Sequence, residues 1–375
     1  MGAPVWNATV RRAFAIFAAV AVTACLTPAA RSQTATEQLP PGPIAFPPQD
    51  TAVGSPVPSE TPQESPRSVT DTYEAPPWVL FPAEPVPDYG FVIDYRARTF
   101  CGSVMSYEFI NPNVNPNFAN TPWSKLRFPL NSTWQGFQTG IEKPEWAVHV
   151  EWLTPMTSNI QGTFCDYDWD PPNANGTFTD LGVGNLRWND AQSVNLDAEC
   201  KGSDTLFGLP VEVWQVFGFR WQRLGVTAYD GEQLLENNQP VAIPLPGDFI
   251  TYNQQYYTAY LGVQLRKAIP FASKEIRLTF QADWGLVWGY GIDYHILRDF
   301  YAINNTHGSS YHLGLTAEVP MSQRLSVGLQ GDYMQIRTTG DFWEEFPTGT
   351  TDSWGNGVGA GSDQTSFTAF VRLHY

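Results

Sequence analysis

Two short stretches from opposite halves of the chain place ionisable side chains two residues apart. They hold Asp166 and Asp168 in "CDYDWD", and Asp293 and His295 in "GIDYHIL". Only 15% of the residues are charged, against about 25% in an average soluble domain. Charged pairs are therefore uncommon enough in this chain to be examined first as candidates for chemistry.

These residue types suit more than one kind of site. Two aspartates held close together cannot both ionise freely, so one keeps a proton or shares a polarised water. An aspartate beside a histidine orients the imidazole and supports its positive charge, which makes a general base. Together the two pairs could hold a water as the nucleophile for a peptide carbonyl. Carboxylates and imidazole also suit a divalent cation, and polar strand tips in water would show the same spacing.

Alternation with a period of two residues predicts the elements that position these pairs. In "IRLTFQADWGLVWGYGIDYH" one face is apolar and aromatic, and the other carries Arg277, Gln281, Asp283, Asp293 and His295. The same alternation recurs in "YTAYLGVQLR", in "SYHLGLTAEV" and in the last residues, "SFTAFVRLHY". This periodicity is typical of β-strands with two different faces.

The composition of the two faces favours a membrane barrel. The apolar face is rich in Trp and Tyr, including Trp284 and Trp288, as in the aromatic girdles of outer-membrane barrels, while the other face is polar. A soluble sandwich also alternates, but its core would not be built in this way. We therefore predict an all-β fold, an antiparallel transmembrane β-barrel with a polar interior.

Strand length predicts where the second pair lies. Ile276 to His295 is a stretch of 20 residues, whereas a membrane-spanning strand needs about 9–11. The link "KAIPFASKE" predicts a periplasmic turn before it, so Asp293 and His295 are expected above the outer surface. The direction of Asp166 stays open, because Phe164 has the same parity and a bulge between them would be needed to keep both in their expected environments.

The formal charge of −16, from 37 acidic and 21 basic residues, argues against a nucleic-acid partner, which needs a cationic surface. It favours cationic partners instead. We expect no cofactor and no resident metal. His307, in "NNTHGSS", is expected in a loop.

The chain divides into three parts. Residues 1–32 are predicted to be a signal peptide, with an apolar run after paired arginines; residues 33–88 are rich in proline and predicted to be a disordered periplasmic linker; residues 89–375 are predicted to form one barrel domain. "VTAC", ending at Cys25, resembles a lipoprotein box, and lipidation stays open.

Three cysteines remain after processing: Cys101, Cys165 and Cys200. Three cannot make a disulfide framework, and one pair plus a free thiol stays open.

From about Asp94 to Tyr375 the chain resembles the omptins, ten-stranded outer-membrane proteases of Gram-negative bacteria. "CDYDWD", followed by "GTFTD", is similar to the family's D-x-D-W segment, and "GIDYH" to its later D-x-H. "GFRWQRLGVTA" is similar to a strand that carries a lipopolysaccharide-contacting arginine, and "GAGSDQTSFTAFVRLHY" resembles the closing strand. The resemblance implies ten strands that extend above the outer membrane, with both barrel termini in the periplasm.

The same resemblance implies an endopeptidase that cleaves peptides or proteins at the cell surface. His295 would be the general base and Asp293 its orienting partner. Asp166 and Asp168 would hold water or the scissile carbonyl opposite them, and Asp180 would support the site.

The sequence departs from the family pattern at several positions. Gly291 stands where the family has a specificity aspartate, and Glu108 is out of register with the family's first-strand glutamate, so a preference for Arg or Lys at the scissile bond stays open. Arg223 matches the lipid-contacting arginine, but Trp221 and Gln255 replace an acidic and a basic residue. Dependence on lipopolysaccharide therefore stays open too.

Two readings without catalysis also stay open. A non-catalytic outer-membrane barrel, acting as an adhesin, a structural protein or a narrow pore, would keep the alternation without needing His295. A soluble secreted β-protein is the other.

Overall fold

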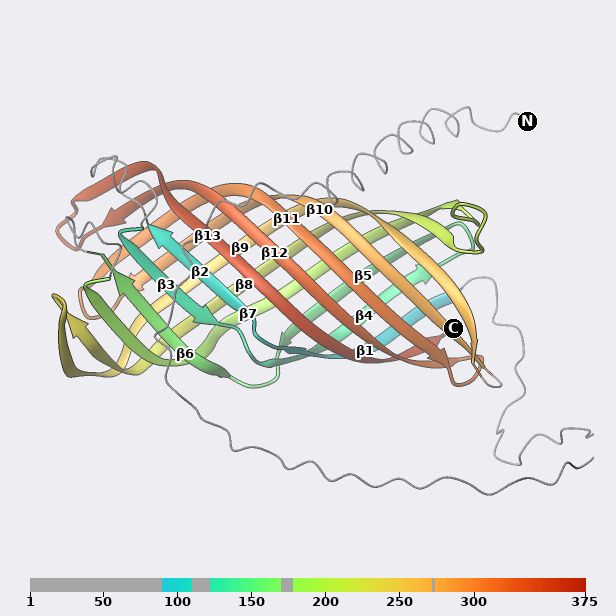
Figure 1. Ribbon diagram of the computed structural model, residues 1–375, viewed down its shortest axis with the longest axis horizontal. Coiled ribbons are helices and arrows are strands. Elements are labelled where there is room, and N and C mark those ends of the chain that lie inside the picture. The colour runs from blue at the N-terminus through green and yellow to red at the C-terminus, as the bar shows by residue number, and fades with distance from the viewer. Residues whose placement is uncertain (1–89, 110–121, 170–177, 272–273) are drawn as a thin grey trace, which may run out of the picture. The chain divides into compact units, whose positions relative to one another are not determined.

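The computed structural model (Figure 1) describes four segments of the chain, residues 90–109, 122–169, 178–271 and 274–375. The predicted signal peptide, the predicted linker and Cys25 lie outside the described residues. Within the described segments no helix is long and apolar enough to cross a membrane.

The described residues form antiparallel β-strands joined in one sheet. The strands are β1 (Gly90–Phe100), β2 (Val104–Phe109), β3 (Ser124–Pro129), β4 (Thr133–Glu142), β5 (Trp146–Pro155), β6 (Asn159–Asp168), β7 (Asp180–Ser203), β8 (Glu212–Glu236), β9 (Gln239–Phe271), β10 (Lys274–His295), β11 (Phe300–Pro320), β12 (Leu325–Glu345) and β13 (Thr351–His374).

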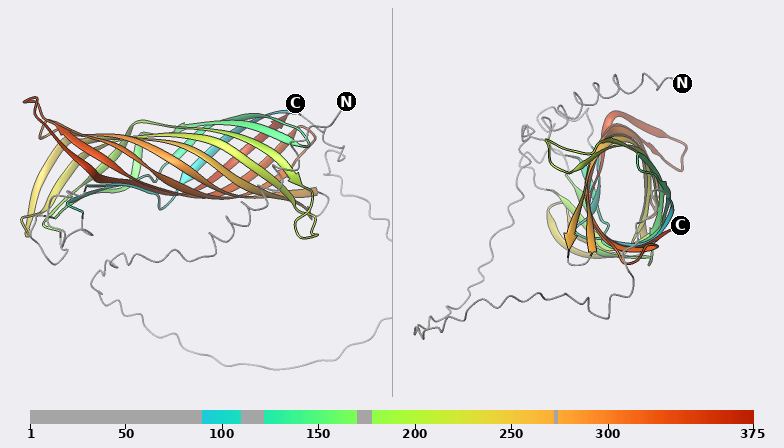
Figure 2. Two further views of the ribbon diagram at one scale, coloured as in Figure 1. Left: turned by 90° about the horizontal axis from the view of Figure 1, so that it is seen from above. Right: turned by 90° about the vertical axis from the view of Figure 1, so that its right-hand side faces the viewer.

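The sheet closes into a ring of ten strand positions. At one level the order is β1-β4-β5-β7-β8-β9-β10-β11-β12-β13, and β13 pairs back with β1. At the other level β2, β3 and β6 take the places of β1, β4 and β5 between β13 and β7. The end-on view in Figure 2 shows the closed ring. The predicted ten-stranded antiparallel barrel is confirmed.

The barrel has two distinct ends. We call the end where β1 begins and β13 finishes the termini end, and the opposite end, where β6 and β10 finish, the site end (at the left in Figure 1). β10 has 22 residues and so measures roughly 70 Å at about 3.3 Å per residue. Even when tilted, it is far longer than the roughly 25 Å apolar band of an outer-membrane barrel, so the strand tips at the site end lie beyond that band.

Exposure follows the predicted alternation. On β10, Trp284, Leu286 and Trp288 are exposed on the outer surface. Val287, which alternates with them, and Asp293, farther along the strand, are buried inside. The expectation that His307 lies in a loop is wrong. His307 is an exposed residue of β11, opposite Trp288 of β10, because the polar run around it continues the strand beyond the membrane band.

The interior near the termini end is polar, as predicted. A cavity of about 1170 Å³ is lined by charged and amide side chains. Its charges are paired: Arg372 lies 2.7 Å from Asp94 and 3.1 Å from Glu318, and His312 lies 2.7 Å from Asp283. Pairing offsets the cost of removing these groups from bulk water.

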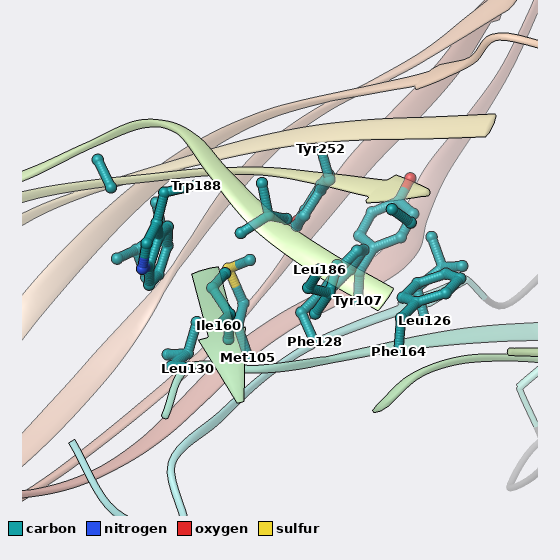
Figure 3. Packing of buried hydrophobic residues seen from close by; sticks show 14 of the residues in the cluster. Met105, Tyr107, Leu126, Phe128, Leu130, Ile160, Phe164, Leu186, Trp188 and Tyr252 are labelled. Atoms are coloured by element: carbon teal, nitrogen blue, oxygen red, sulfur yellow. The ribbon is translucent and has the colours of Figure 1, made fainter. Parts of the chain in front are cut away.

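The interior near the site end holds a large apolar cluster beside buried amides such as Asn304 and Gln254, which corrects the prediction of a polar interior. Phe128 of β3 lies between Phe164 of β6 and Tyr252 of β9, with ring centroids 5.1 and 4.9 Å away, and Figure 3 shows this packing. These rings belong to a buried cluster to which strands from β1 to β13 contribute. A ten-stranded ring is narrow enough for large side chains to fill it.

This cluster settles the direction of Asp166. The ladder between β6 and β7 is regular from Phe164 to Asp168, and the register shift lies earlier, between Ile160 and Phe164. Phe164 and Asp166 therefore both face the interior without a bulge between them. The three cysteines left open above, Cys101, Cys165 and Cys200, are all free thiols.

We predict that Phe128→Ala lowers the free energy of unfolding by about 3–5 kcal/mol, the usual cost of removing a fully buried ring. Unfolding would be followed by tryptophan fluorescence in detergent with increasing urea. Phe137→Ala is the matched control, because Phe137 is 54% exposed on the outer surface. Equal losses for both variants would show that the aromatic cluster does not brace the barrel.

Candidate active site

The aspartate pair lies at the C-terminal end of β6. Asp166 pairs with Gly182 of β7 and Leu126 of β3, and Asp168 pairs with Asp180 and Ser124. Strands on both sides therefore fix the backbone of the pair. Because they are two residues apart on a regular strand, both carboxyl groups share one face, and the apolar cluster lies directly below them.

The aspartate–histidine pair lies at the end of β10. His295 Nε2 is 3.0 Å from Asp293 Oδ2, and the Asp293 side chain is 1% exposed. The His295 ring stacks on Phe300 of β11 at 4.4 Å and 11°, and Phe300 stacks on Phe346. The hydrogen bond to Asp293 and the flat face of Phe300 therefore both fix the orientation of the imidazole.

The two pairs lie on facing walls of the barrel. β6 and β10 are not neighbours in the ring, since β7, β8 and β9 separate them on the shorter side. Even so, the charge of Asp293 acts on Asp166 and that of His295 acts on Asp168. The fold therefore brings the four predicted residues around one opening.

Burial sets the protonation of the aspartate pair. The pKa of Asp166 is raised well above its ordinary range. Burial, which removes water from the carboxyl group, is the largest cause, the negative charge of Asp168 is the second, and the positive charge of Arg298 opposes the rise. Burial likewise raises the pKa of Asp168. Raised pKa values favour a state in which one of the two carboxyl groups keeps its proton.

Each pair also presents a free acceptor. Asp166 Oδ1 and Asp293 Oδ1 are buried and have no hydrogen-bond partner among the described residues. They can accept hydrogen bonds from a water or from a substrate amide placed between the walls. No cluster of three metal-ligating side chains occurs in the described part of the chain.

Asp180 lies beside the aspartate pair but serves its surroundings. Its Oδ2 accepts a hydrogen bond of 2.7 Å from the Thr179 hydroxyl, and its Oδ1 accepts one of 3.2 Å from the Asn237 backbone. These contacts tie the start of β7 to the turn between β8 and β9. The geometry fits a supporting residue.

Two residues at this opening were not singled out in the sequence. Arg298, in the turn after β10, has Nη2 2.8 Å from His295 Nδ1. Glu344, the next-to-last residue of β12, carries a half-buried carboxyl group. Burial raises its pKa, and the charge of His295 opposes this rise. Arg298 follows His295 by three residues, and this closeness in sequence could have pointed to it. Glu344 is distant in sequence and comes near the site only because the sheet closes into a barrel.

The two departures from the family's specificity pattern have structural counterparts. A Cβ at Gly291 would lie 2.3 Å from Asn304 Nδ2 and 2.5 Å from Gln254 Oε1, so neutral amides fill the space of a side chain there. Glu108 is half-exposed and lies 2.8 Å from Lys125, while its neighbour Tyr107 faces the interior. Neither position supplies a carboxylate to the site.

Arg223 lies on the outside of the barrel, away from the opening. Its Nη1 is 2.7 Å from Asp190 Oδ2, and it borders a groove of about 260 Å³ lined by Tyr290, Tyr294 and Tyr301 together with Gln255. A cation beside tyrosines on an outward face suits the headgroup level of a membrane.

Comparison with known proteins bears on both the fold and the family. The sequence model of the Omptin family matches residues 120–375. The crystal structure of the outer membrane protease OmpT from Escherichia coli superposes with a TM-score of 0.64 at 17% identity, covering 76% of this chain and 97% of OmpT.

A weaker likeness is to the translocator domain of the autotransporter NalP from Neisseria meningitidis, with a TM-score of 0.30, 8% identity, and coverage of 76% of this chain and 88% of that domain. No curated protein sequence matches the chain. The family match spans more than half of the chain and includes both residue pairs of the opening. The chain therefore belongs to the omptin family.

Proposed function

We propose that the protein is an outer-membrane endopeptidase that cleaves peptides or proteins at the cell surface with a water held between its two residue pairs. The observation that carries this proposal is the contact of His295 with buried Asp293, on the wall facing Asp166 and Asp168. A histidine held by a carboxylate, opposite carboxyls with raised pKa, provides a base and a proton donor around one space.

In the proposed reaction the water lies between His295 and the aspartate pair. His295 takes a proton from the water as it attacks the peptide carbonyl, and Asp293 stabilises the imidazolium that forms. A protonated carboxyl group of the Asp166 and Asp168 pair can donate a hydrogen bond to the carbonyl oxygen as negative charge develops on it. His295 then gives its proton to the leaving amine, which restores the starting state.

We propose that the site end faces the exterior and that the termini end faces the periplasm, where the predicted linker would lie. The length of β10 supports this, because its tip extends beyond the membrane band. A site on such a tip meets extracellular peptides without a pore through the barrel.

Charge supports cationic peptides or proteins as substrates. Asp166, Asp168, Asp293 and Glu344 act on one another electrostatically around the opening, and the whole chain carries a formal charge of −16. Opposite charge raises the rate of encounter with such substrates. Because the neutral amides of Asn304 and Gln254 fill the space beside Gly291, a substrate need not present Arg or Lys at the scissile bond.

We propose that Arg223 contacts a phosphate group of outer-membrane lipid or lipopolysaccharide. Asp190 already pairs with it, so the lipid would compete with this carboxylate. The effect on activity is expected to be modest.

The first prediction concerns the base. His295→Ala should lower kcat/KM by at least about 10²-fold, the usual range for loss of a general base. The full chain would be refolded in detergent with lipopolysaccharide, and a mixed peptide library would be read by mass spectrometry. His307→Ala is the matched control. Cleavage that survives His295→Ala would favour the non-catalytic barrel and a contaminating protease.

The second prediction concerns the aspartate pair. A raised pKa in the folded state contributes stability that is present below the ordinary Asp pKa of about 3.9 and is lost as pH rises through the raised value. Asp166→Asn should therefore stabilise the barrel at neutral pH, where the wild type loses that contribution, and it should abolish cleavage because the proton donor is lost. This gain in stability should vanish in acid.

Urea unfolding of the Asp166→Asn barrel at several pH values measures this effect. Glu145→Gln, at an exposed residue between β4 and β5 near the termini end, is the control for loss of one negative charge. A stability difference that does not change with pH would contradict the raised pKa of the pair.

The third prediction concerns the lipid. Arg223→Ala should raise the lipopolysaccharide concentration that gives half-maximal cleavage, because a positive charge facing the phosphate is lost. Arg187→Ala is the control, since Arg187 also pairs with an aspartate, Asp248, on the same wall. Identical titrations of the Arg223→Ala barrel and the wild type would remove Arg223 from the lipid site.

A further inference from the structure

The turn between β10 and β11 returns an arginine to the imidazole that the proposed reaction needs. The Arg298 backbone N–H donates to the His295 carbonyl at 3.1 Å, and Asp299 follows with a φ of 51°, which reverses the chain. The Arg298 guanidinium lies 5.2 Å from the centre of the Phe300 ring, the same ring on which His295 stacks. Backbone and ring together direct Arg298 to His295.

The contact fixes the protons on His295. A guanidinium has only donors, so Arg298 Nη2, 2.8 Å away, must donate to an unprotonated Nδ1. The ring proton therefore sits on Nε2, which donates to Asp293 Oδ2 at 3.0 Å. Neither nitrogen then has a free lone pair, and His295 cannot take a proton from water in this state.

Arg298 also lies toward the opposite wall. Its charge acts on both Asp166 and Asp168, so the guanidinium lies within electrostatic reach of the aspartate pair. Among the described residues no carboxylate lies within ion-pair distance of it, and the nearby Asp299 accepts from the Tyr294 hydroxyl instead. The direct contacts of this exposed side chain are a neutral imidazole and one aromatic ring, so no salt bridge has to be broken when it moves.

We propose that Arg298 is a gating residue, which blocks His295 Nδ1 in the resting barrel and withdraws when a substrate enters between the two walls. This inference rests on the proposed function. A cationic peptide would take over the favourable interactions with Asp166, Asp168 and Glu344, and the withdrawal of Arg298 would free Nδ1 to receive the proton of the water. Each binding event would thus include the displacement of Arg298.

Kinetics provide the first test. Because a blocked fraction of the protein weakens apparent binding, Arg298→Ala should lower KM roughly fivefold, the worth of one ordinary hydrogen bond, and leave kcat unchanged. Arg298→Lys should stay close to the wild type. Millimolar methylguanidinium should raise the KM of the Arg298→Ala barrel again. Lys125→Ala, which removes a cation paired with Glu108 on the outer face, is the control.

A second measurement does not depend on activity. Diethyl pyrocarbonate acylates a neutral imidazole through its free lone pair, so His295 should react several-fold faster in the Arg298→Ala barrel than in the wild type. Mass spectrometry would locate the modification, with exposed His307 as the internal reference in each sample. Heat-modifiable gel mobility would verify that each variant is folded.

The outcomes separate the two proposals. A fall in kcat for Arg298→Ala would make Arg298 a participant in the reaction and overturn the gate, as would unchanged KM or unchanged labelling of His295. If no variant cleaves any peptide, the proposed function fails, and the labelling of His295 alone decides whether Arg298 blocks it.

Discussion

The apolar packing beneath the opening is the constraint on which the rest of the site depends. Phe128, Phe164 and Tyr252 fill the narrow ring. Aromatic side chains therefore exclude water from the interior side of the carboxyl groups at the site end. Strand closure alone would leave a polar channel like the one near the termini end. The cluster instead gives β6 and β10 fixed positions across the opening, and it withdraws Asp166 and Asp293 from water.

Burial of these carboxyl groups lowers the stability of the barrel at neutral pH but can serve catalysis. Burial raises the pKa of Asp166 and Asp168, which destabilises the folded barrel at neutral pH relative to a chain with neutral side chains there. The same burial favours a protonated carboxyl group in the pair, which can serve a reaction as a proton donor. Near the termini end the buried carboxylates lie beside cations instead, as Asp94 lies 2.7 Å from Arg372 and Asp283 lies 2.7 Å from His312. The two halves of one lumen therefore have different tasks.

Much of the fold followed from the period-two alternation, because a strand with one lipid-facing side leaves a strong sequence pattern. The contact of Asp293 with His295 followed from their spacing on one strand. The inward direction of Phe164 did not, because apolar side chains normally face lipid in a membrane barrel, and only the position of Phe164 beyond the membrane band places it inside. Arg298 and Glu344 were also missed, since a turn and a distant strand bring them to the opening.

The central claim is that the two residue pairs act as one unit on a single water. A double-mutant cycle between Asp166 and His295, with kcat/KM measured for the wild type, Asp166→Asn, His295→Ala and the double variant, tests it most directly. Residues that act together show grossly non-additive losses, so the double variant should lose little more than the worse single variant. Losses that multiply would show that the two walls act independently and would contradict the account.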